Sequence, residues 1–332
     1  MKTKIYNTTE DSIREAAEVI ARGGLIAFPT ETVYGLGADA MNADAVAAVY
    51  EAKGRPSDNP MIVHIARHED LEKLTPHVTS DMRTLMQKVW PGPLTMVVPR
   101  GEKVPHRTTG GLETVAVRMP NSDAALKLIE YSGCPIAAPS ANISGRPSPT
   151  RAEDVIFDMD GRIDGIINGE DCQVGIESTV LDMTGDEPTI LRPGIMTAEK
   201  LEAVLGKKVG YDKALFQKVT DTDFKPKSPG MKYKHYAPKA DMVIVSGERP
   251  KVEAEIAKIK AEKEAAGLKT GVILFGENDF EEAAHDLFAD LRDMDEAGVD
   301  LIIAGALSTE NQIGFAVMNR MVKSAGYNII EV

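Results

Sequence analysis

Residues 50–65 read YEAKGRPSDNPMIVHI, and they contain the end of a helix, a stiff turn and a buried strand. Helical spacing predicts a helix over 43–53 that ends at Gly54, a residue that tolerates the turn. The proline after Arg55 restricts the chain, and the MIVHI that follows is typical of a strand. This order holds Lys53 and Arg55 rigidly beside a sheet. The pair fits either an anion site or favourable cations at a helix C-terminus, and this stretch alone leaves both open.

Outward from this stretch, strands often follow one another without a helix between them, which favours a mixed sheet. Apolar patterning predicts strands at 24–28, 61–65, 94–98, 114–119, 135–139, 178–183 and 188–192. It predicts helices at 9–22, 43–53, 80–89, 122–132, 151–158 and 197–205. Thr8 and Asp11 have the spacing of a capping box for the first of these helices.

The C-terminal region shows a cleaner alternation. Strands are predicted at 242–246, 271–275, 300–305 and 327–332, with helices at 250–266, 279–293 and 311–324. This order favours a small, Rossmann-like parallel sheet. The stretch DFKPKSPGMKYKHYAPKAD before it is rich in Pro and Lys and has little periodicity, which is typical of a linker or a lid. We therefore expect an α/β domain over 1–205, a linker over 206–240 and a second α/β domain over 241–332.

Composition excludes several classes of protein. The formal net charge of −13 argues against a general nucleic-acid binder. Five lysines and His235 nevertheless lie between Lys225 and Lys239 without an acid, which suggests a compact anionic ligand. Only Cys134 and Cys172 occur, so a disulfide framework is not expected. No apolar run is long enough to span a membrane and the N-terminus lacks a signal-peptide pattern, so we expect a cytoplasmic protein that does not contact membranes.

Two motifs resemble known binding sites but lack the context that those sites require. GLGADA (35–40) fits a dinucleotide fingerprint, but residues 29–34 separate it from the preceding strand, so a dinucleotide site is not expected. His64 and His68 have the spacing of a zinc-binding helix, but His64 lies on the predicted strand MIVHI and no glutamate of that motif follows. His64 is instead a candidate hydrogen-bonding group on a strand.

The segment PSANISGRPSPT (139–150) follows a predicted strand and is dense in Ser, Asn, Gly and Pro. Ser140 and Asn142 lie on the same side if the chain is extended there. Such a loop fits phosphate binding or an ordinary polar turn equally well. No Ser–His–Asp arrangement is evident, so a covalent serine mechanism is not indicated.

Several long motifs occur in one order: FPTETVYGLGADA, YEAKGRPSDNPMIVHI, VWPGPLT, TVAVRMP, PIAAPSANISGRPSPT, GIESTVLD and ILRPG. This order resembles the YrdC-type L-threonylcarbamoyladenylate synthases over roughly residues 10–200. The later SPGMKYKHYAP and the α/β tail resemble the long, two-domain form of that family. The resemblance implies a twisted, mixed-sheet catalytic domain with a positively lined cavity, joined by the Pro/Lys-rich linker to a Rossmann-like domain.

The resemblance also implies a reaction. L-threonine, bicarbonate or CO2, and ATP would give threonylcarbamoyl-AMP and pyrophosphate, for threonylcarbamoyladenosine modification of tRNA. The product would pass to a separate tRNA threonylcarbamoyl transferase, and strong tRNA binding is not expected. Mg²⁺ would be carried on the phosphates, with no metal held by side chains.

Residues are assigned from the resemblance position by position. The expected phosphate-handling residues are Lys53, Arg55, Ser140 and Asn142. The expected ATP contacts are Arg55, Asn59, Thr114, Ser140, Ser148, Arg192 and Tyr236. The expected threonine contacts are Thr32, His64, Arg118, Ala138 and Ser178.

The chemistry agrees with the residue types. A threonine carbamate can attack the α-phosphorus without a protein nucleophile, so the site must position two anions and neutralise their charge. Two alternatives are weaker. An RNA-binding module conflicts with the net charge of −13, and a carbamoyl-phosphate enzyme of the related type needs Cys-rich zinc segments that two cysteines cannot supply.

Overall fold

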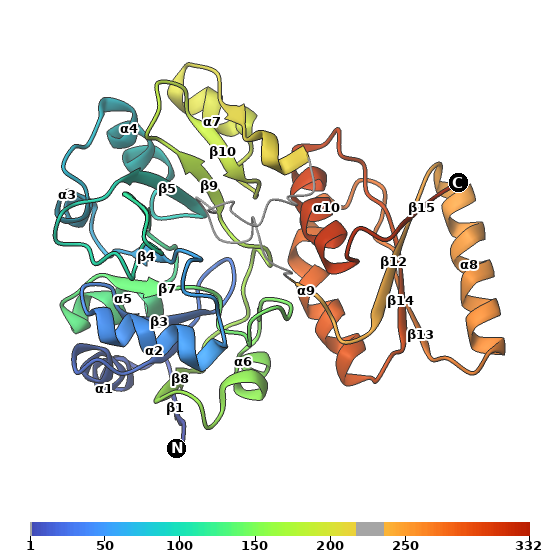
Figure 1. Cartoon of the computed structure of the whole chain (residues 1–332), viewed down its shortest axis with the longest axis horizontal. Coiled ribbons are helices and arrows are strands. Elements are labelled where there is room, and N and C mark those ends of the chain that lie inside the picture. The colour runs from blue at the N-terminus through green and yellow to red at the C-terminus, as the bar shows by residue number, and fades with distance from the viewer. Residues whose placement is uncertain (1, 217–235) are drawn as a thin grey trace.

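The computed structural model describes residues 2–216 and 236–332, which form two domains, each built on its own sheet (Figure 1). The first domain holds an 11-stranded sheet that contains both parallel and antiparallel pairs. The second domain holds a 4-stranded sheet whose pairs are all parallel. The expected combination of a mixed-sheet domain with a small parallel α/β domain is confirmed.

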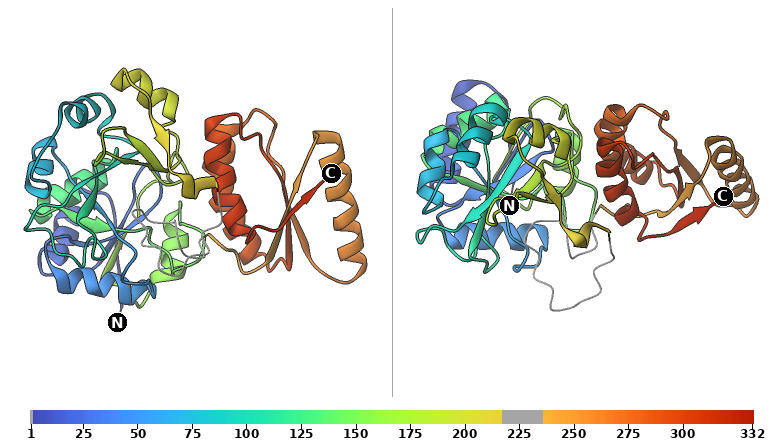
Figure 2. Two further views of the ribbon diagram at one scale, coloured as in Figure 1. Left: turned by 45° about the horizontal axis from the view of Figure 1, so that its top comes forward. Right: turned by 90° about the horizontal axis from the view of Figure 1, so that it is seen from above.

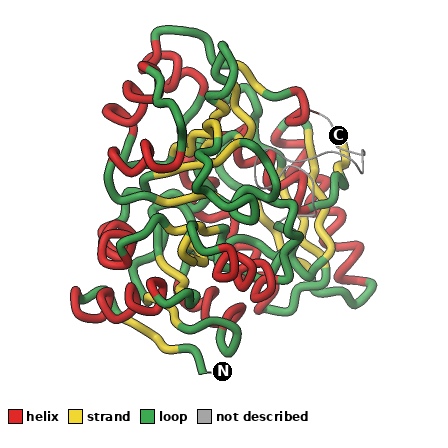
Figure 3. Tube along the Cα trace, turned by 60° about the vertical axis from the view of Figure 1, so that its left-hand side comes forward, coloured by secondary structure: helices red, strands yellow, loops and turns green. Residues whose placement is uncertain are grey.

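The strands of the first sheet are mostly short, and long loops run between them (Figure 3). In spatial order they are β1 (Lys4–Tyr6), β8 (Gly165–Ile167), β2 (Ile26–Phe28), β3 (Gly35–Asp39), β7 (Ile136–Ala138), β4 (Ile62–His64), β6 (Thr114–Arg118), β5 (Leu94–Pro99), β9 (Thr179–Asp182), β10 (Thr189–Arg192) and β11 (Gly210–Tyr211). Because β4 and β6 are parallel neighbours, His64 pairs with Arg118, and both reach the same end of the sheet.

Apolar side chains cover this sheet on opposite faces. In β2, Ile26 and Phe28 face one cluster while Ala27 faces another, as the period of two in a strand requires. The helices of this domain are α1 (Glu10–Ala21), α2 (Ala43–Lys53), α3 (Leu71–Leu74), α4 (Ser80–Val89), α5 (Asp123–Ser132), α6 (Ala152–Met159) and α7 (Ala198–Leu205), with short 3₁₀ turns η1 (His68–Asp70) and η2 (Lys213–Phe216).

The second domain has the strand order β13 (Thr270–Ile273), β14 (Leu301–Gly305), β12 (Asp241–Ser246) and β15 (Ile329–Glu331). Helix α8 (Arg249–Ala265) covers the outer face of this sheet (Figure 1). Helices α9 (Phe280–Glu296) and α10 (Gln312–Ser324) cover the other face and lie between the sheet and the first domain (Figure 2). Those two helices are therefore the ones that contact the first domain.

The interface between the domains continues the apolar core of the second one. Val33 and Ile176 of the first domain are buried in the same cluster as Phe288 of α9. Gly175 has a φ of 81°, and a Cβ there would lie 2.2 Å from the carbonyl oxygen of His285. Only glycine allows α9 to approach this closely. The two domains are thus packed tightly at the segment that precedes Glu177.

Sequence and structure differ in a few elements. The short strands β1, β3 and β8 were not expected, and the glycines of GLGAD lie within β3 rather than at a strand-to-helix turn. The capping box prediction is wrong, because Thr9 is the N-cap of α1 and its side chain makes no capping hydrogen bond. Asn7 Oδ1 instead accepts a hydrogen bond from the Thr9 hydroxyl at 2.5 Å.

The expected linker is described only at its two ends. Residues 206–216 contain β11 and η2, and described residues resume at Tyr236. The predicted basic segment lies mostly outside the described residues, including Lys225, Lys227, Lys232, Lys234 and His235. Within the described ranges, no helix is long and apolar enough to cross a membrane.

Candidate active site

A cavity with an empty volume of about 550 Å³ lies where β4, β6 and β7 end, next to the second domain. Its wall contains all five predicted threonine contacts: Thr32, His64, Arg118, Ala138 and Ser178. It also contains four predicted ATP contacts: Arg55, Ser140, Arg192 and Tyr236. We call the first set the threonine half and the predicted ATP contacts the nucleotide half. Residues from seven separate motifs of the sequence thus meet in one place.

Arg118 organises the threonine half from the end of β6. Its side chain is 3% exposed, and its Nη1 donates a hydrogen bond to Thr32 Oγ1 at 2.8 Å. Its Nε donates to the carbonyl oxygen of Gly92 at 3.2 Å, and its Nη2 lies 2.6 Å from Glu31 Oε2. All of these partners belong to the first domain. A buried planar guanidinium fixed in this way is suited to bind a carboxylate.

Glu31 was missed by the sequence analysis. It is 8% exposed and pairs with Arg118 by distance, yet neither carboxylate oxygen has an aligned hydrogen bond to the described residues. The pair is therefore held mainly by charge. The signal that could have found it is an acidic residue inside FPTETVYG, directly beside the predicted contact Thr32.

His64 is neutral at ordinary pH. Burial, together with the charge of Arg118, lowers the pKa of its imidazole to about 3. The ring packs edge-on against Phe28, with 6.0 Å between the ring centroids, and Nδ1 lies 3.2 Å from the carbonyl oxygen of Ile62. A neutral imidazole can donate one hydrogen bond and accept another without adding charge.

Arg55 and Arg192 bring positive charge to the nucleotide half. Arg55 Nη2 donates to the carbonyl oxygen of Pro60 at 3.0 Å, and burial lowers its pKa to about 10, so the guanidinium stays charged at neutral pH. Arg192 Nε donates to the Ser178 carbonyl oxygen at 3.0 Å, and its Nη2 donates to Ser178 Oγ at 3.1 Å. Because Ser178 belongs to the threonine half, Arg192 connects the two halves.

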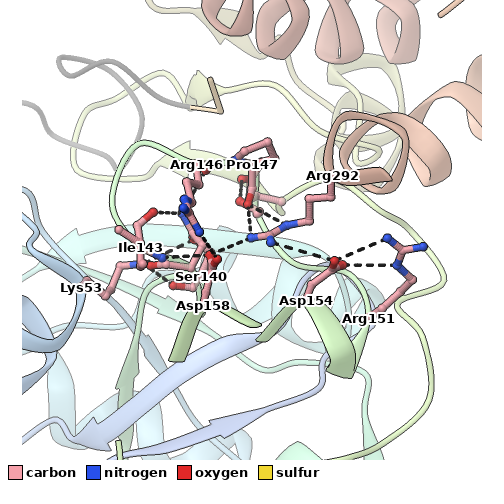
Figure 4. A network of polar contacts seen from close by, with 12 residues as sticks. Lys53, Ser140, Ile143, Arg146, Pro147, Arg151, Asp154, Asp158 and Arg292 are labelled. Carbon is pink, nitrogen blue, oxygen red and sulfur yellow. Dashed lines mark hydrogen bonds and ion pairs between the residues drawn. The ribbon is translucent and has the colours of Figure 1, made fainter. Parts of the chain in front are cut away.

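Lys53 does not lie on the cavity wall. Lys53 is 2% exposed, and its Nζ donates to the carbonyl oxygens of Ser140 and Asn142, at 2.5 Å each (Figure 4). Burial, together with the charge of Arg55, lowers the pKa of this amine well below its usual value. Ser140 Oγ donates to Asn142 Oδ1, also at 2.5 Å. Gly54, with a φ of 63°, ends α2 immediately after Lys53, as predicted. The predicted quartet is thus assembled in part, with Lys53 fixing the loop that presents the Ser140 hydroxyl.

The remaining predicted contacts are not on the wall: Asn59, Thr114, Asn142 and Ser148. Asn59 is 2% exposed, and its Oδ1 has no hydrogen-bond partner among residues 2–216 and 236–332. Thr114 begins β6 and is partly exposed. An unpaired buried amide oxygen is costly, so Asn59 is suited to receive a donor from a ligand.

Glu177 is a second acidic residue that the sequence analysis missed. Its Oε1 accepts a hydrogen bond from Ser148 Oγ at 2.7 Å, and its Oε2 accepts one from Arg320 Nε at 3.1 Å. Burial raises its pKa, but the charges of Arg320 and Arg192 outweigh burial and leave the pKa below its usual value. Glu177 is therefore an anion in the cavity wall, and its main cationic partner comes from α10 of the second domain.

Tyr236 brings the end of the linker to the same wall. Its ring stacks on Phe288 of α9, with 5.1 Å between centroids and 29° between planes. Burial, with the nearby charge of Glu177, raises the pKa of its hydroxyl to about 12. The second domain thus contributes the surface on which this predicted ATP contact rests.

A side-chain metal site is absent from the described part of the chain, where no group of three His, Cys, Asp or Glu residues could hold an ion. Glu177 lines the cavity and faces Arg320, whereas Glu31, which is not on the cavity wall, faces Arg118.

Comparison with known proteins decides the family. A family model described as Telomere recombination, for Sua5, YciO and YrdC proteins, matches residues 18–194, and one described as Threonylcarbamoyl-AMP synthase, C-terminal domain, matches residues 196–326. Threonylcarbamoyl-AMP synthases of Pyrococcus abyssi and Bacillus subtilis are 50% and 46% identical, over 97% and 99% of this chain and 96% and 100% of their own lengths. The chain belongs to the threonylcarbamoyl-AMP synthase family.

Its fold agrees with that family over the whole chain. The crystal structure of P. abyssi Sua5 complexed with L-threonine is 49% identical and superimposes with a TM-score of 0.94, covering 99% of this chain and 100% of that one. The predicted resemblance to threonylcarbamoyl-AMP synthases is therefore confirmed. Membership makes the chain an ATP-using nucleotidyltransferase of tRNA modification.

Proposed function

We propose that the cavity binds L-threonine and ATP side by side and transfers the adenylyl group of ATP to threonine carbamate. The supporting observation is that nine residues predicted to contact the two substrates line this one cavity. The products would be threonylcarbamoyl-AMP and pyrophosphate. The P. abyssi relative, whose structure carries L-threonine, supports the same substrate here.

In the threonine half, Arg118 binds the substrate carboxylate through its fixed guanidinium. The neutral imidazole of His64 and the hydroxyls of Thr32 and Ser178 then form hydrogen bonds with the polar groups of threonine. The carboxylate competes with Glu31 for the guanidinium, because Arg118 Nη2 already lies 2.6 Å from Glu31 Oε2. This competition lowers the affinity for threonine below the value that the contact between Arg118 and the substrate carboxylate would give by itself.

In the nucleotide half, Arg55 and Arg192 neutralise the triphosphate. Asn59, whose Oδ1 has no hydrogen-bond partner within the described part of the chain, offers that oxygen to a donor of the nucleotide. The carbamate oxygen attacks the α-phosphorus while the bond to pyrophosphate breaks, so no covalent enzyme intermediate is needed. Catalysis is then positioning and charge neutralisation. Mg²⁺ carried by the phosphates would supply further neutralisation of the leaving group.

The product would leave for a separate tRNA threonylcarbamoyl transferase. With a net charge of −13, the protein is not expected to bind tRNA strongly on its own. We further propose a cytoplasmic location, where ATP and bicarbonate are available.

The test is product analysis by mass spectrometry after incubation with ATP, threonine and ¹³C-bicarbonate. We expect labelled threonylcarbamoyl-AMP, and pyrophosphate release that requires threonine. Pyrophosphate release that did not depend on threonine would reject the substrate assignment.

The variant that tests the predicted phosphate-handling residues is Lys53→Met. It removes the side-chain nitrogen that donates to the carbonyl oxygens of Ser140 and Asn142. We expect turnover to fall on the order of 10²–10³, as for the loss of one preorganised charge contact. Thermal melting shows whether the variant is folded. A folded variant with wild-type turnover would remove Lys53 from the mechanism.

A further inference from the structure

Two buried arginines of the second domain contact the first domain, and both bind segments that carry residues of the nucleotide half. Arg320 on α10 is 0% exposed, and Arg292 on α9 is 6% exposed. A buried guanidinium is stable only when its donors are matched by acceptors. The acceptors of these two residues are therefore informative about what the interface does.

Arg320 joins two loops of the first domain. Its Nε donates to Glu177 Oε2 at 3.1 Å and its Nη2 to the Glu177 carbonyl oxygen at 3.4 Å, while its Nη1 donates to the carbonyl oxygen of Pro193. Glu177 precedes Ser178 in the chain, and Pro193 follows Arg192. One planar side chain thus fixes the segments that carry both partners of the Arg192–Ser178 contact.

Arg292 holds the third segment of the same half. Its Nη2 donates to the carbonyl oxygen of Pro147 at 2.7 Å and to Asp158 Oδ2 at 3.0 Å. Asp158 in turn accepts hydrogen bonds from the backbone N–H of Ile143 at 3.1 Å and from Arg146 Nη1 at 2.6 Å (Figure 4). The loop from Ile143 to Pro147 is therefore tied to α9 at several points.

The two arginines converge on Ser148. Arg292 fixes the peptide that precedes it, and Arg320 fixes the carboxylate of Glu177 that accepts its hydroxyl at 2.7 Å. Arg320 also supplies the positive charge that offsets Glu177, an anion that would otherwise repel a triphosphate across the cavity. Both the geometry and the charge of this half thus depend on the second domain.

We infer that Arg320 and Arg292 are positioning residues for nucleotide binding, so that the active site is completed by the C-terminal domain. The inference rests on the proposed assignment of Ser148 and Arg192 to ATP. Neither arginine lies on the cavity wall, and each acts through residues of the first domain.

The experiment uses the full-length variants Arg320→Met and Arg292→Met. We expect the Kd and the KM for ATP to rise about tenfold, the range for losing a charged hydrogen bond, while the KM for threonine stays within about twofold. A merely structural role would lower the active fraction and kcat, and would leave both values for ATP unchanged. Arg320→Lys keeps the charge but not the fork, so we expect a smaller rise in the Kd for ATP.

The matched control is Asp293→Asn, which removes the exposed ion pair with Arg151 across the same interface. We expect its ATP affinity to equal that of the wild type. In the Arg320→Met background, Glu177→Gln should raise the melting temperature by removing a buried charge that has lost Arg320, and it should restore only the part of the ATP affinity that was lost to repulsion of the triphosphate.

Unchanged Kd and KM for ATP in either folded Arg→Met variant would overturn the role of that arginine, as would an equal loss in Asp293→Asn. If the Arg→Met variants do not fold, the Kd of Arg320→Lys decides in the same way. ATP affinity is measured by calorimetry without threonine. A wild-type protein that binds ATP but forms no threonylcarbamoyl-AMP would therefore reject the proposed function while this comparison still stands.

Discussion

On the threonine side of the cavity, Arg118 contacts Thr32, Gly92 and Glu31, all in the first domain. On the nucleotide side, Glu177 is paired with Arg320, which lies in the second domain. The Arg118 contacts of the threonine half therefore form within a single domain, whereas the nucleotide half also requires the two domains to pack. The difference suggests that the affinities for the two substrates can be changed independently.

The largest expected effect comes from the double variant Arg118→Met/Glu31→Gln, which removes the guanidinium without leaving its carboxylate partner charged and buried. The KM for threonine should rise on the order of 10², because a charged, buried pair of hydrogen bonds to a carboxylate is lost. The Kd for ATP should not change. Steady-state kinetics and calorimetry measure the two values, and a parallel loss of ATP affinity would show that the halves are coupled.

A smaller effect is expected from Gly175→Ala, which acts on the interface alone. The new Cβ would lie 2.2 Å from the His285 carbonyl oxygen, so α9 must move, and the free energy of unfolding should fall by about 2–3 kcal/mol. ATP affinity should fall with it, while the KM for threonine should not change.

Gly133→Ala is the control for backbone strain. Gly133 has a similar φ of 69°, but a Cβ there meets nothing within 4 Å. We expect a loss of about 1–2 kcal/mol and normal ATP affinity. Equal losses of stability and affinity in both variants would contradict a role for the contact with α9. Urea unfolding gives the free energies.

The last expected effect, a change in pH dependence, comes from His64→Gln. Since the pKa of His64 is about 3 in the folded protein, against about 6.5 in the unfolded chain, only the unfolded chain takes up a proton between these values. The wild type should lose stability as pH falls through this window, at about 1.4 kcal/mol per pH unit from this group. The variant should show a shallower slope of unfolding free energy against pH from 6.5 to 4.5. Identical slopes would mean that His64 is protonated in the folded state.

Much of this arrangement could be predicted from the sequence, and the exceptions have physical reasons. Helix 43–53 and its end at Gly54 follow from local chemistry. Strand β3 was missed because GLGAD has two glycines and no β-branched residue, although Gly37 is needed where a Cβ would lie 2.6 Å from Ile136.

Within the site, the order of motifs indicated which residues would meet at the cavity. It could not predict the hydrogen bonds and ion pairs that hold those residues in position. Lys53 was expected to face the phosphates, and its ammonium instead turns toward two backbone carbonyls. Arg320 was not identified, because QIGFAVMNRMVKS looks like any amphipathic helix and its partner lies 143 positions earlier. Long-range polar pairs of this kind leave no local pattern.

The distance in sequence between Glu177 and Arg320 also has a consequence during synthesis of the chain. A chain emerging from the ribosome releases its first domain well before α10. Until that helix arrives, Glu177 lacks its guanidinium and the loop to Ser148 lacks its anchor. On the inferred role of Arg320, a nascent or prematurely terminated chain would bind threonine but would bind ATP poorly. Such an incomplete chain would therefore not hydrolyse or sequester ATP.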